Sequence, residues 1–132
     1  MTEFNYETEI DVRFRDLDSM GHVNNAVYAT FFEHARTLYI DEVFGGRPEE
    51  INVALVNLNI DFKRQVRFGE TVTVGVGVTE IGESSVTMEY TVRTDDEVAA
   101  TGSTILVAID DEGNSRAMPE EIRERIEEHE GL

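Results

Sequence analysis

The chain has 132 residues, no cysteine and a formal net charge of −17, which comes from 28 acidic and 11 basic residues. A chain of this length can bury a core of its own, so we expect a single domain over residues 1–132 that needs no disulfide or metal. The lack of cysteine excludes disulfides, thiolate zinc sites and cysteine nucleophiles. The negative field would repel nucleic acid and an anionic membrane surface.

Lysine is almost absent, because Lys63 is the only lysine and the other basic residues are arginines. Surplus carboxylates with so little lysine are similar to the composition of proteins from salt-loving microbes, in which ions screen the self-repulsion. Simple solubility is the alternative explanation. No apolar run follows a basic start, and none approaches the ~20 apolar residues that a membrane span needs. We therefore expect a cytoplasmic protein that does not enter a membrane.

The first half of the chain predicts a strand followed by a long helix. Apolar and polar residues alternate over residues 4–14, which predicts a half-buried strand that ends at Asp16. From Ala26 to Val43 the apolar residues recur at steps of three and four, which predicts a helix of about five turns. The helix is rich in aromatic residues, so one face should be deeply buried against a sheet. The Gly45-Gly46 pair is expected to stop it.

The second half predicts four more strands and a short helix. Alternating patterns cover residues 56–62, 72–78 and 86–92, and a longer apolar run falls within 98–109. Pro119 is expected to start an acidic terminal helix. One long helix and a mostly antiparallel sheet predict a two-layer α+β domain. The valine-rich strands have small or polar residues on their other face, so we expect pairing with another copy, with a dimer as the smallest unit.

Polar residues and glycine crowd the junction between the first strand and the long helix: Asp16, Asp18, Gly21, His22, Asn24 and Asn25. Asn24 or Asn25 is a reasonable N-cap for the helix. A helix start offers unpaired backbone N–H groups and the positive end of a dipole. A carboxylate held beside it can attack a carbonyl, or deprotonate a water that attacks. The junction therefore predicts a site for carbonyl chemistry, with Asp16 the more structural of the two aspartates.

A metal site at the same junction is not expected. Asp16, Asp18 and Gly21 have the spacing that opens a calcium-binding loop, but Met20 and Val27 stand where that loop needs oxygen ligands. No pair of histidines in the chain has metal-ligand spacing either.

The junction closely resembles a known family. The pattern V-x-F-x-D-x-D-x-x-G-H-V-N-N-x-x-Y-x-x-x-F-E-x-A-R, over residues 12–36, is similar to the 4-hydroxybenzoyl-CoA thioesterase branch of the hotdog-fold acyl-CoA thioesterases. Weaker similarity continues at residues 62–70 and 100–102, so the resemblance covers most of the chain. It implies a hotdog fold, in which a curled five-stranded antiparallel sheet wraps around one long helix.

The resemblance also implies an activity: hydrolysis of an acyl-CoA or a related acyl thioester without a cofactor. Active sites of the family lie at the interface of a dimer, often within a tetramer, so a homodimer or homotetramer is expected. The position of the family's catalytic carboxylate is occupied by Asp18, as nucleophile or general base. The family's carbonyl-polarising backbone N–H corresponds to Asn25, where other members carry tyrosine or histidine; a backbone donor does not depend on that side chain.

Further residues are candidates for substrate binding. Gly21, His22 and Asn24 would shape the loop around the thioester, with His22 as an alternative base, although hydrogen bonding that fixes the loop is favoured. Tyr28 is either a core residue or a wall of the acyl site. Lys63 and Arg64, which form a basic cluster with Arg67, would meet the phosphates of coenzyme A, or else the cluster would serve as edge-strand charges that deter aggregation.

Two other functions are considered. A hotdog-fold hydratase or dehydratase would need an acid–base pair on the helix, and Glu33 and His34 do not form a recognisable one; Glu33 is expected to pair with Arg36 instead. A non-catalytic acyl-thioester binder has no reason to hold a carboxylate at a helix start. The acidity of the chain makes docking of an acidic carrier protein less favourable, which favours free coenzyme A.

Overall fold

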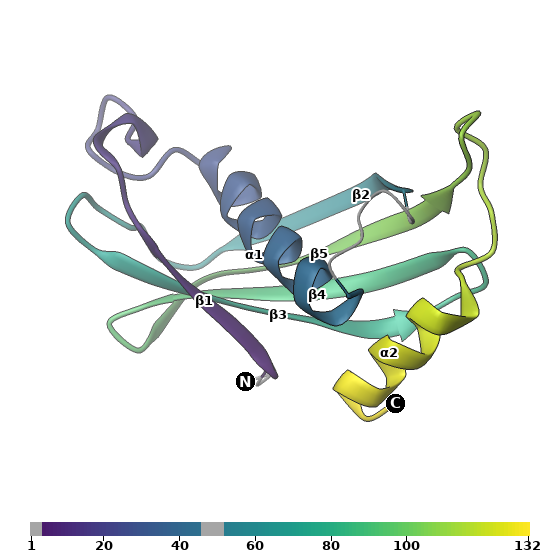
Figure 1. The fold of residues 1–132 in the computed structure, drawn as a ribbon. Helices are drawn as coiled ribbons and strands as arrows, with labels where there is room; N and C mark the ends of the chain where they lie inside the picture. The colour runs from purple at the N-terminus through teal and green to yellow at the C-terminus, as the bar shows by residue number, and fades with distance from the viewer. Residues whose placement is uncertain (1–3, 46–51) are drawn as a thin grey trace.

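The computed structural model describes residues 4–45 and 52–132, in which a five-stranded antiparallel sheet is crossed by one long helix (Figure 1). The strands stand in the order β1-β3-β4-β5-β2, so β1 and β2 are the edges. The elements along the chain are β1 Tyr6–Asp11, the 3-10 turn η1 Phe14–Asp16, α1 Val27–Val43, β2 Asn52–Phe62, β3 Thr71–Ile81, β4 Ser85–Thr94, β5 Glu97–Ile109 and α2 Glu120–Glu130. The predicted α+β class and element order are confirmed.

Aromatic packing seats α1 on the sheet. The buried face of the helix meets the valines of β3 and β4, and Phe32 stacks on Tyr90 with ring centroids 4.3 Å apart and planes 6° apart. Gly102 of β5 makes this stack possible, because a Cβ there would collide with the Phe32 ring and lie 2.5 Å from the carbonyl oxygen of Asn59. The Phe32 ring of the helix therefore packs directly on the backbone of the sheet at Gly102.

The first strand is shorter than predicted. It ends at Asp11, because Phe14–Asp16 forms a 3-10 turn in which the buried Asp16 carboxylate accepts the Arg13 backbone N–H at 2.8 Å. Such a side-chain bond to the backbone competes with the sheet ladder. Phe14 continues the alternating pattern in sequence, yet its side chain is 79% exposed.

The second strand is longer than predicted. β2 begins at Asn52 rather than at Val56, and a bulge between Leu55 and Asn57 shifts its register against β5. The extra residue breaks the period of two, which is why the sequence pattern shows only the second half of the strand. Gly46, expected to help end α1, lies outside the described residues, whereas Gly45 has the left-handed φ of +89° that ends a helix.

The exposed apolar surface of the sheet lies on edge strand β2, at Leu55, Val56, Leu58 and Phe62. The valines of β3 and β4 face α1 and are buried. These are the two strands predicted to pair with another copy, yet the large exposed apolar side chains of the sheet lie on β2. On the opposite face of β3, the Phe4 ring covers two glycines.

The terminal helix α2 docks beside β3 (Figure 1). It begins at Glu120, with Pro119 at the N-cap, and Ile126 is its buried anchor. Near its end, the Glu130 carboxylate accepts the Tyr39 hydroxyl at 2.5 Å and the Val78 backbone N–H at 2.9 Å. Nowhere in the described part of the chain is there a helix with the length and apolar character to cross a membrane.

Candidate active site

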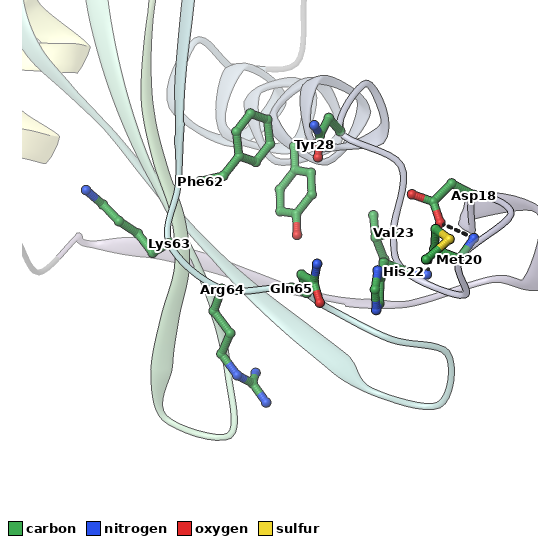
Figure 2. A pocket seen from close by; sticks show the side chains of 10 residues that line it. Asp18, Met20, His22, Val23, Tyr28, Phe62, Lys63, Arg64 and Gln65 are labelled. Carbon is green, nitrogen blue, oxygen red and sulfur yellow. Dashed lines mark hydrogen bonds between the residues drawn. The ribbon is translucent and has the colours of Figure 1, made fainter.

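A cavity of about 650 Å³ opens beside the N-terminal end of α1 (Figure 2). One wall is the loop between η1 and α1, and the other is the end of β2 with the residues that follow it. The residues that line the cavity are Asp18, Met20, His22, Val23, Asn25, Tyr28, Phe62, Lys63, Arg64 and Gln65. The structure thus brings the predicted catalytic pair into one cavity with most of the predicted binding residues.

The Asp18 carboxylate is held through one of its two oxygens. Oδ1 accepts the backbone N–H groups of Met20 at 2.8 Å and His22 at 3.2 Å. A backbone bond from the Asp18 N–H to the His22 carbonyl at 2.8 Å closes the loop, and Gly21 supplies the φ of +81° that the turn requires. Oδ2 has no hydrogen-bond partner in the described part of the chain and is available to a substrate in the cavity.

The backbone N–H of Asn25, at the helix start, has no hydrogen-bond partner in the described part of the chain. Its neighbours are occupied: the Asn24 N–H donates to the Asp16 carbonyl at 2.9 Å, and the Ala26 N–H donates to Asn24 Oδ1 at 2.9 Å. The Val27 N–H donates to the Asn24 carbonyl at 2.9 Å. Among residues 24–27, only the Asn25 N–H lacks a partner within the described residues, and Asn25 lines the cavity.

Asn24 supports the helix start from outside the standard cap position. Ala26 stands at the N-cap of α1, and its side chain cannot accept a hydrogen bond. The Asn24 side chain accepts the Ala26 N–H instead. Asn24 is absent from the cavity lining, so its part in the site is to shape the backbone.

Asp16 is structural, as the sequence suggested. Its carboxylate is buried and bonded to the Arg13 guanidinium at 2.9 Å. Burial by itself raises the pKa of Asp16, but the hydrogen bonds and positive charge of Arg13 outweigh it and hold the pKa below its ordinary value. Because the Asp16 carbonyl also accepts the Asn24 N–H, this anchored turn fixes the loop that carries Asp18.

Tyr28 belongs to both the core and the cavity wall. Its ring packs edge-on against Phe31 and Phe62, with centroids 5.8 Å and 5.1 Å apart. The side chain is 2% exposed, and its hydroxyl points toward the cavity (Figure 2). Burial raises the pKa of Tyr28, and the charge of Glu70 raises it further, so the hydroxyl keeps its proton near neutral pH and can donate it in a hydrogen bond.

The two basic residues at the cavity differ in their surroundings. The Arg64 guanidinium lies among three carboxylates, 3.2 Å from Glu97, 3.6 Å from Glu70 and 3.9 Å from Asp95. Its charge is therefore largely matched within the protein. Lys63 is exposed, and its side chain points away from the cavity in Figure 2. That these two residues meet phosphates stays a prediction.

The backbone of His22 fixes the loop, in line with the favoured interpretation. It bonds to Asp18 in both directions and pairs with Arg67 in an isolated antiparallel bridge. Glu33 and His34 are exposed on α1 and do not line the cavity, which gives no support to a hydratase. The expected pair between Glu33 and Arg36 is wrong: the Arg36 guanidinium instead reaches the Tyr90 hydroxyl at 3.3 Å.

Sequence reasoning missed four lining residues: Met20, Val23, Phe62 and Gln65. Phe62 is the last residue of β2 and Gln65 follows three residues later, and this segment reaches the loop only through the fold. The signal nearest to them was the weak similarity over residues 62–70. Within residues 4–45 and 52–132, no group of three or more His, Asp and Glu side chains is placed to hold a metal ion.

A free backbone N–H at a helix start, with a carboxylate in the same cavity, suits hydrolysis of an acyl ester or thioester. Placed on a five-stranded sheet curled around one helix, it defines the hotdog-fold thioesterases, a class of thioester hydrolases. Residues 12–126 match the family model of the Thioesterase-like superfamily. The chain belongs to this superfamily, which confirms the resemblance of its sequence and the hotdog fold.

Several characterised or solved proteins are similar to this chain. A thioesterase from Thermus thermophilus, solved with coenzyme A and zinc, is 39% identical with a TM-score of 0.91, over 100% of this chain and 99% of that one. The long-chain acyl-CoA thioesterase FadM of Escherichia coli (strain K12) is 29% identical over 128 residues, which is 92% of this chain and 97% of the relative. The chloroplastic acyl-acyl carrier protein thioesterase ATL3 of Arabidopsis thaliana is 34% identical over 79 residues, 56% of this chain and 40% of the relative.

Proposed function

We propose that this protein hydrolyses an acyl-CoA thioester to the free acid and coenzyme A. One observation carries the proposal: Asn25, whose N–H has no partner in the described part of the chain, and Asp18, whose Oδ2 has none there either, both line the same cavity. The thioester oxygen would accept the Asn25 N–H, and the carbonyl carbon would face Asp18.

Asp18 supports either of two routes. As nucleophile, its Oδ2 forms a bond to the carbonyl carbon and the C–S bond breaks, which gives a mixed anhydride and a thiolate that takes a proton from water. A water molecule then hydrolyses the anhydride and restores the carboxylate. As general base, Asp18 instead takes a proton from a water that attacks the carbonyl directly.

The start of α1 stabilises the negative charge that develops on the carbonyl oxygen. The Asn25 N–H donates a hydrogen bond to it, and the positive end of the helix dipole lies behind that donor. Removing a single donor of this type costs ~3 kcal/mol of transition-state stabilisation. This contribution comes from the backbone and is unaffected by the asparagine side chain.

Coenzyme A is the favoured thiol. Similarity to a thioesterase solved with coenzyme A and to a long-chain acyl-CoA thioesterase extends over nearly the whole chain, whereas similarity to a carrier-protein thioesterase covers about half of it. The net charge of −17 would also oppose an acidic carrier protein across a wide interface.

We further propose a homodimer as the functional unit, formed along edge strand β2. Its unpaired edge and exposed Val56, Leu58 and Phe62 offer both hydrogen-bonding groups and apolar area to a second copy. Because Phe62 also lines the cavity, a partner that covers β2 would close one side of the site.

The test is thiol release from a panel of acyl-CoAs in high salt by the wild type and by Asp18→Asn. We expect kcat to fall by about 10³-fold in the variant, the size of effect that general acid–base catalysis gives. Asp111→Asn, which removes the same charge from an exposed turn, is the matched control and should leave kcat unchanged. Full activity in Asp18→Asn would contradict the proposed role, and no thiol release from any substrate would contradict the proposed reaction.

A further inference from the structure

Two phenylalanines that the proposed reaction does not use stand exposed together beside the catalytic loop. Phe14 of η1 is 79% exposed and Phe68, between β2 and β3, is 59% exposed. Their rings meet edge to face, with centroids 6.2 Å apart and planes 79° apart. Two large aromatic rings are exposed to water here on an otherwise acidic surface. Exposed apolar area of this kind indicates a binding site.

The backbone connects this aromatic pair directly to the loop that holds Asp18. Phe14 lies in the turn that leads into the loop, and Phe68 follows Arg67, which pairs with His22 in an antiparallel bridge. The Val23 N–H donates to the Val66 carbonyl at 2.7 Å. Bridged Cα atoms are ~5 Å apart and consecutive ones about 3.8 Å, so the Phe68 backbone lies within about 10 Å of His22.

Positive charge accompanies the aromatic pair. Arg15 and Arg67, each next to one of the phenylalanines, are exposed, and no carboxylate lies within 4.0 Å of either guanidinium in the described part of the chain. In contrast, Arg13 and Arg64 are paired with carboxylates.

A second cavity leads from the candidate active site toward Arg67. It measures about 270 Å³ and is lined by Arg64, Gln65, Arg67 and Glu70, of which Arg64 and Gln65 also line the first cavity. The one carboxylate in its wall, Glu70, is occupied by Arg64 at 3.6 Å and by the Thr94 hydroxyl at 2.9 Å. The two cavities therefore adjoin at Arg64 and Gln65, and Arg67, next to Phe68 in the chain, lines the second of them.

We propose that Phe14, Phe68, Arg15 and Arg67 form the binding platform for the phosphorylated adenosine end of the coenzyme A substrate, an inference that rests on the proposed function. The adenine ring stacks on a phenylalanine face, and the two arginines bind phosphate oxygens. The flat base matches the exposed rings, and the phosphates match the local positive charge.

Charge and area favour this occupant over a macromolecule. An acidic carrier protein would face the whole charge of −17 across a wide interface, whereas a nucleotide would contact only the aromatic pair and the exposed Arg15 and Arg67. The larger apolar surface that a second copy could cover lies elsewhere, on β2.

The experiment compares two substrates with the same acyl group, an acyl-CoA and the acyl-pantetheine that lacks the nucleotide. In the Phe14→Ala/Phe68→Ala double variant, we expect the KM for acyl-CoA to rise by about tenfold, as loss of a stacked base implies. We expect a rise of about the same size in Arg67→Gln, from loss of a charged hydrogen bond to phosphate. The kcat for acyl-CoA and both constants for acyl-pantetheine should stay at wild-type values. Arg116→Gln and Leu132→Ala remove an exposed charge and an exposed apolar side chain elsewhere, and should change nothing.

A binding measurement separates this inference from the reaction. Adenosine 3′,5′-bisphosphate, titrated calorimetrically into the wild type, should bind, and should bind about tenfold more weakly to the double variant. If the wild type hydrolyses no thioester but binds this probe in a Phe68-dependent way, the proposed reaction fails and the platform stands. Equal losses with both substrates, a change in molecular mass by light scattering, or unchanged binding of the probe would each overturn the platform.

Discussion

At the scale of single residues, the two groups proposed to act on the thioester are prepared by hydrogen bonds that other groups make. Asp18 has one oxygen occupied by backbone donors and one open. Asn24 occupies both donors that follow Asn25 and so leaves the Asn25 N–H as the free one among residues 24–27. Within these hydrogen bonds, the only side chains that take part are those of Asp18 and Asn24.

The role of the Asn25 backbone can be separated from that of its side chain. Asn25→Ala keeps the N–H, so we expect kcat within a few-fold of the wild type. Asn25→Pro removes the N–H at a position before the N-cap Ala26, where no intrahelical hydrogen bond is lost, and kcat should fall by about 10²-fold or more. Steady-state thiol release checks both, with circular dichroism to show that each variant is folded. Equal kcat values for the two variants would rule out this N–H as the oxyanion donor.

Asp16 gives a prediction about stability and pH. Its lowered pKa in the folded state means that it stabilises the fold at pH values above its ordinary value of 3.8, and that this contribution is lost as pH falls through the lower folded value. Asp16→Asn should therefore cost roughly 1–3 kcal/mol in the free energy of unfolding at neutral pH. The difference from the wild type should shrink in strong acid, below the folded pKa, as measured by urea titration. A difference that is constant with pH would show that the charge of Asp16 is not what matters.

At the scale of elements, the sequence predicted which site residues lie close together when they are also close in the chain. It did not predict which distant segments the fold brings to the same cavity. Asp18 and Asn25 fall within one continuous stretch, so their relation follows from the strand–loop–helix pattern. Phe62 reaches the same cavity only because β2 pairs with β5 at the edge of the sheet, which no local pattern encodes. The boundary errors have similar causes: the Asp16 side chain ended β1 early, and the bulge after Leu55 hid half of β2.

The close packing of α1 on the sheet depends on the absence of a side chain at Gly102. In Gly102→Ala the new Cβ would collide with the Phe32 ring and with the Asn59 carbonyl oxygen, both of which belong to packed elements. We expect a loss of roughly 1–3 kcal/mol in the free energy of unfolding, the usual cost of overpacking a core. Thermal unfolding checks this, with Ser103→Ala on the neighbouring residue as a control that should be nearly neutral. A variant as stable as the wild type would mean that the helix can lift from the sheet without cost.

At the scale of the whole molecule, the net charge of −17 sets the response to salt. Like charges on the surface repel one another, and the distance over which they do so falls from ~10 Å at ~0.1 M salt to ~3 Å at ~1 M. Adaptation to high salt and a cytoplasmic location both stay predictions from composition.

The melting temperature should therefore rise between about 0.1 M and about 2 M KCl, because screening relieves the repulsion in the compact state. Scanning calorimetry with a matched series in sucrose, which is excluded from the surface but screens no charge, isolates the electrostatic part. Equal gains in the two series would show that self-repulsion does not limit the stability of this chain.

The backbone bonds around Asp18 also bear on how such a site can diversify. The N–H groups of Met20 and His22 orient the carboxylate, and the N–H of Asn25 is the donor left for the substrate, while all three residues line the cavity. Any residue other than proline supplies the same N–H. The side chains at these three positions can therefore change during evolution, or be randomised in a directed-evolution library, without loss of the backbone donors. Such changes would alter the preference for the acyl group and leave the proposed reactive geometry in place.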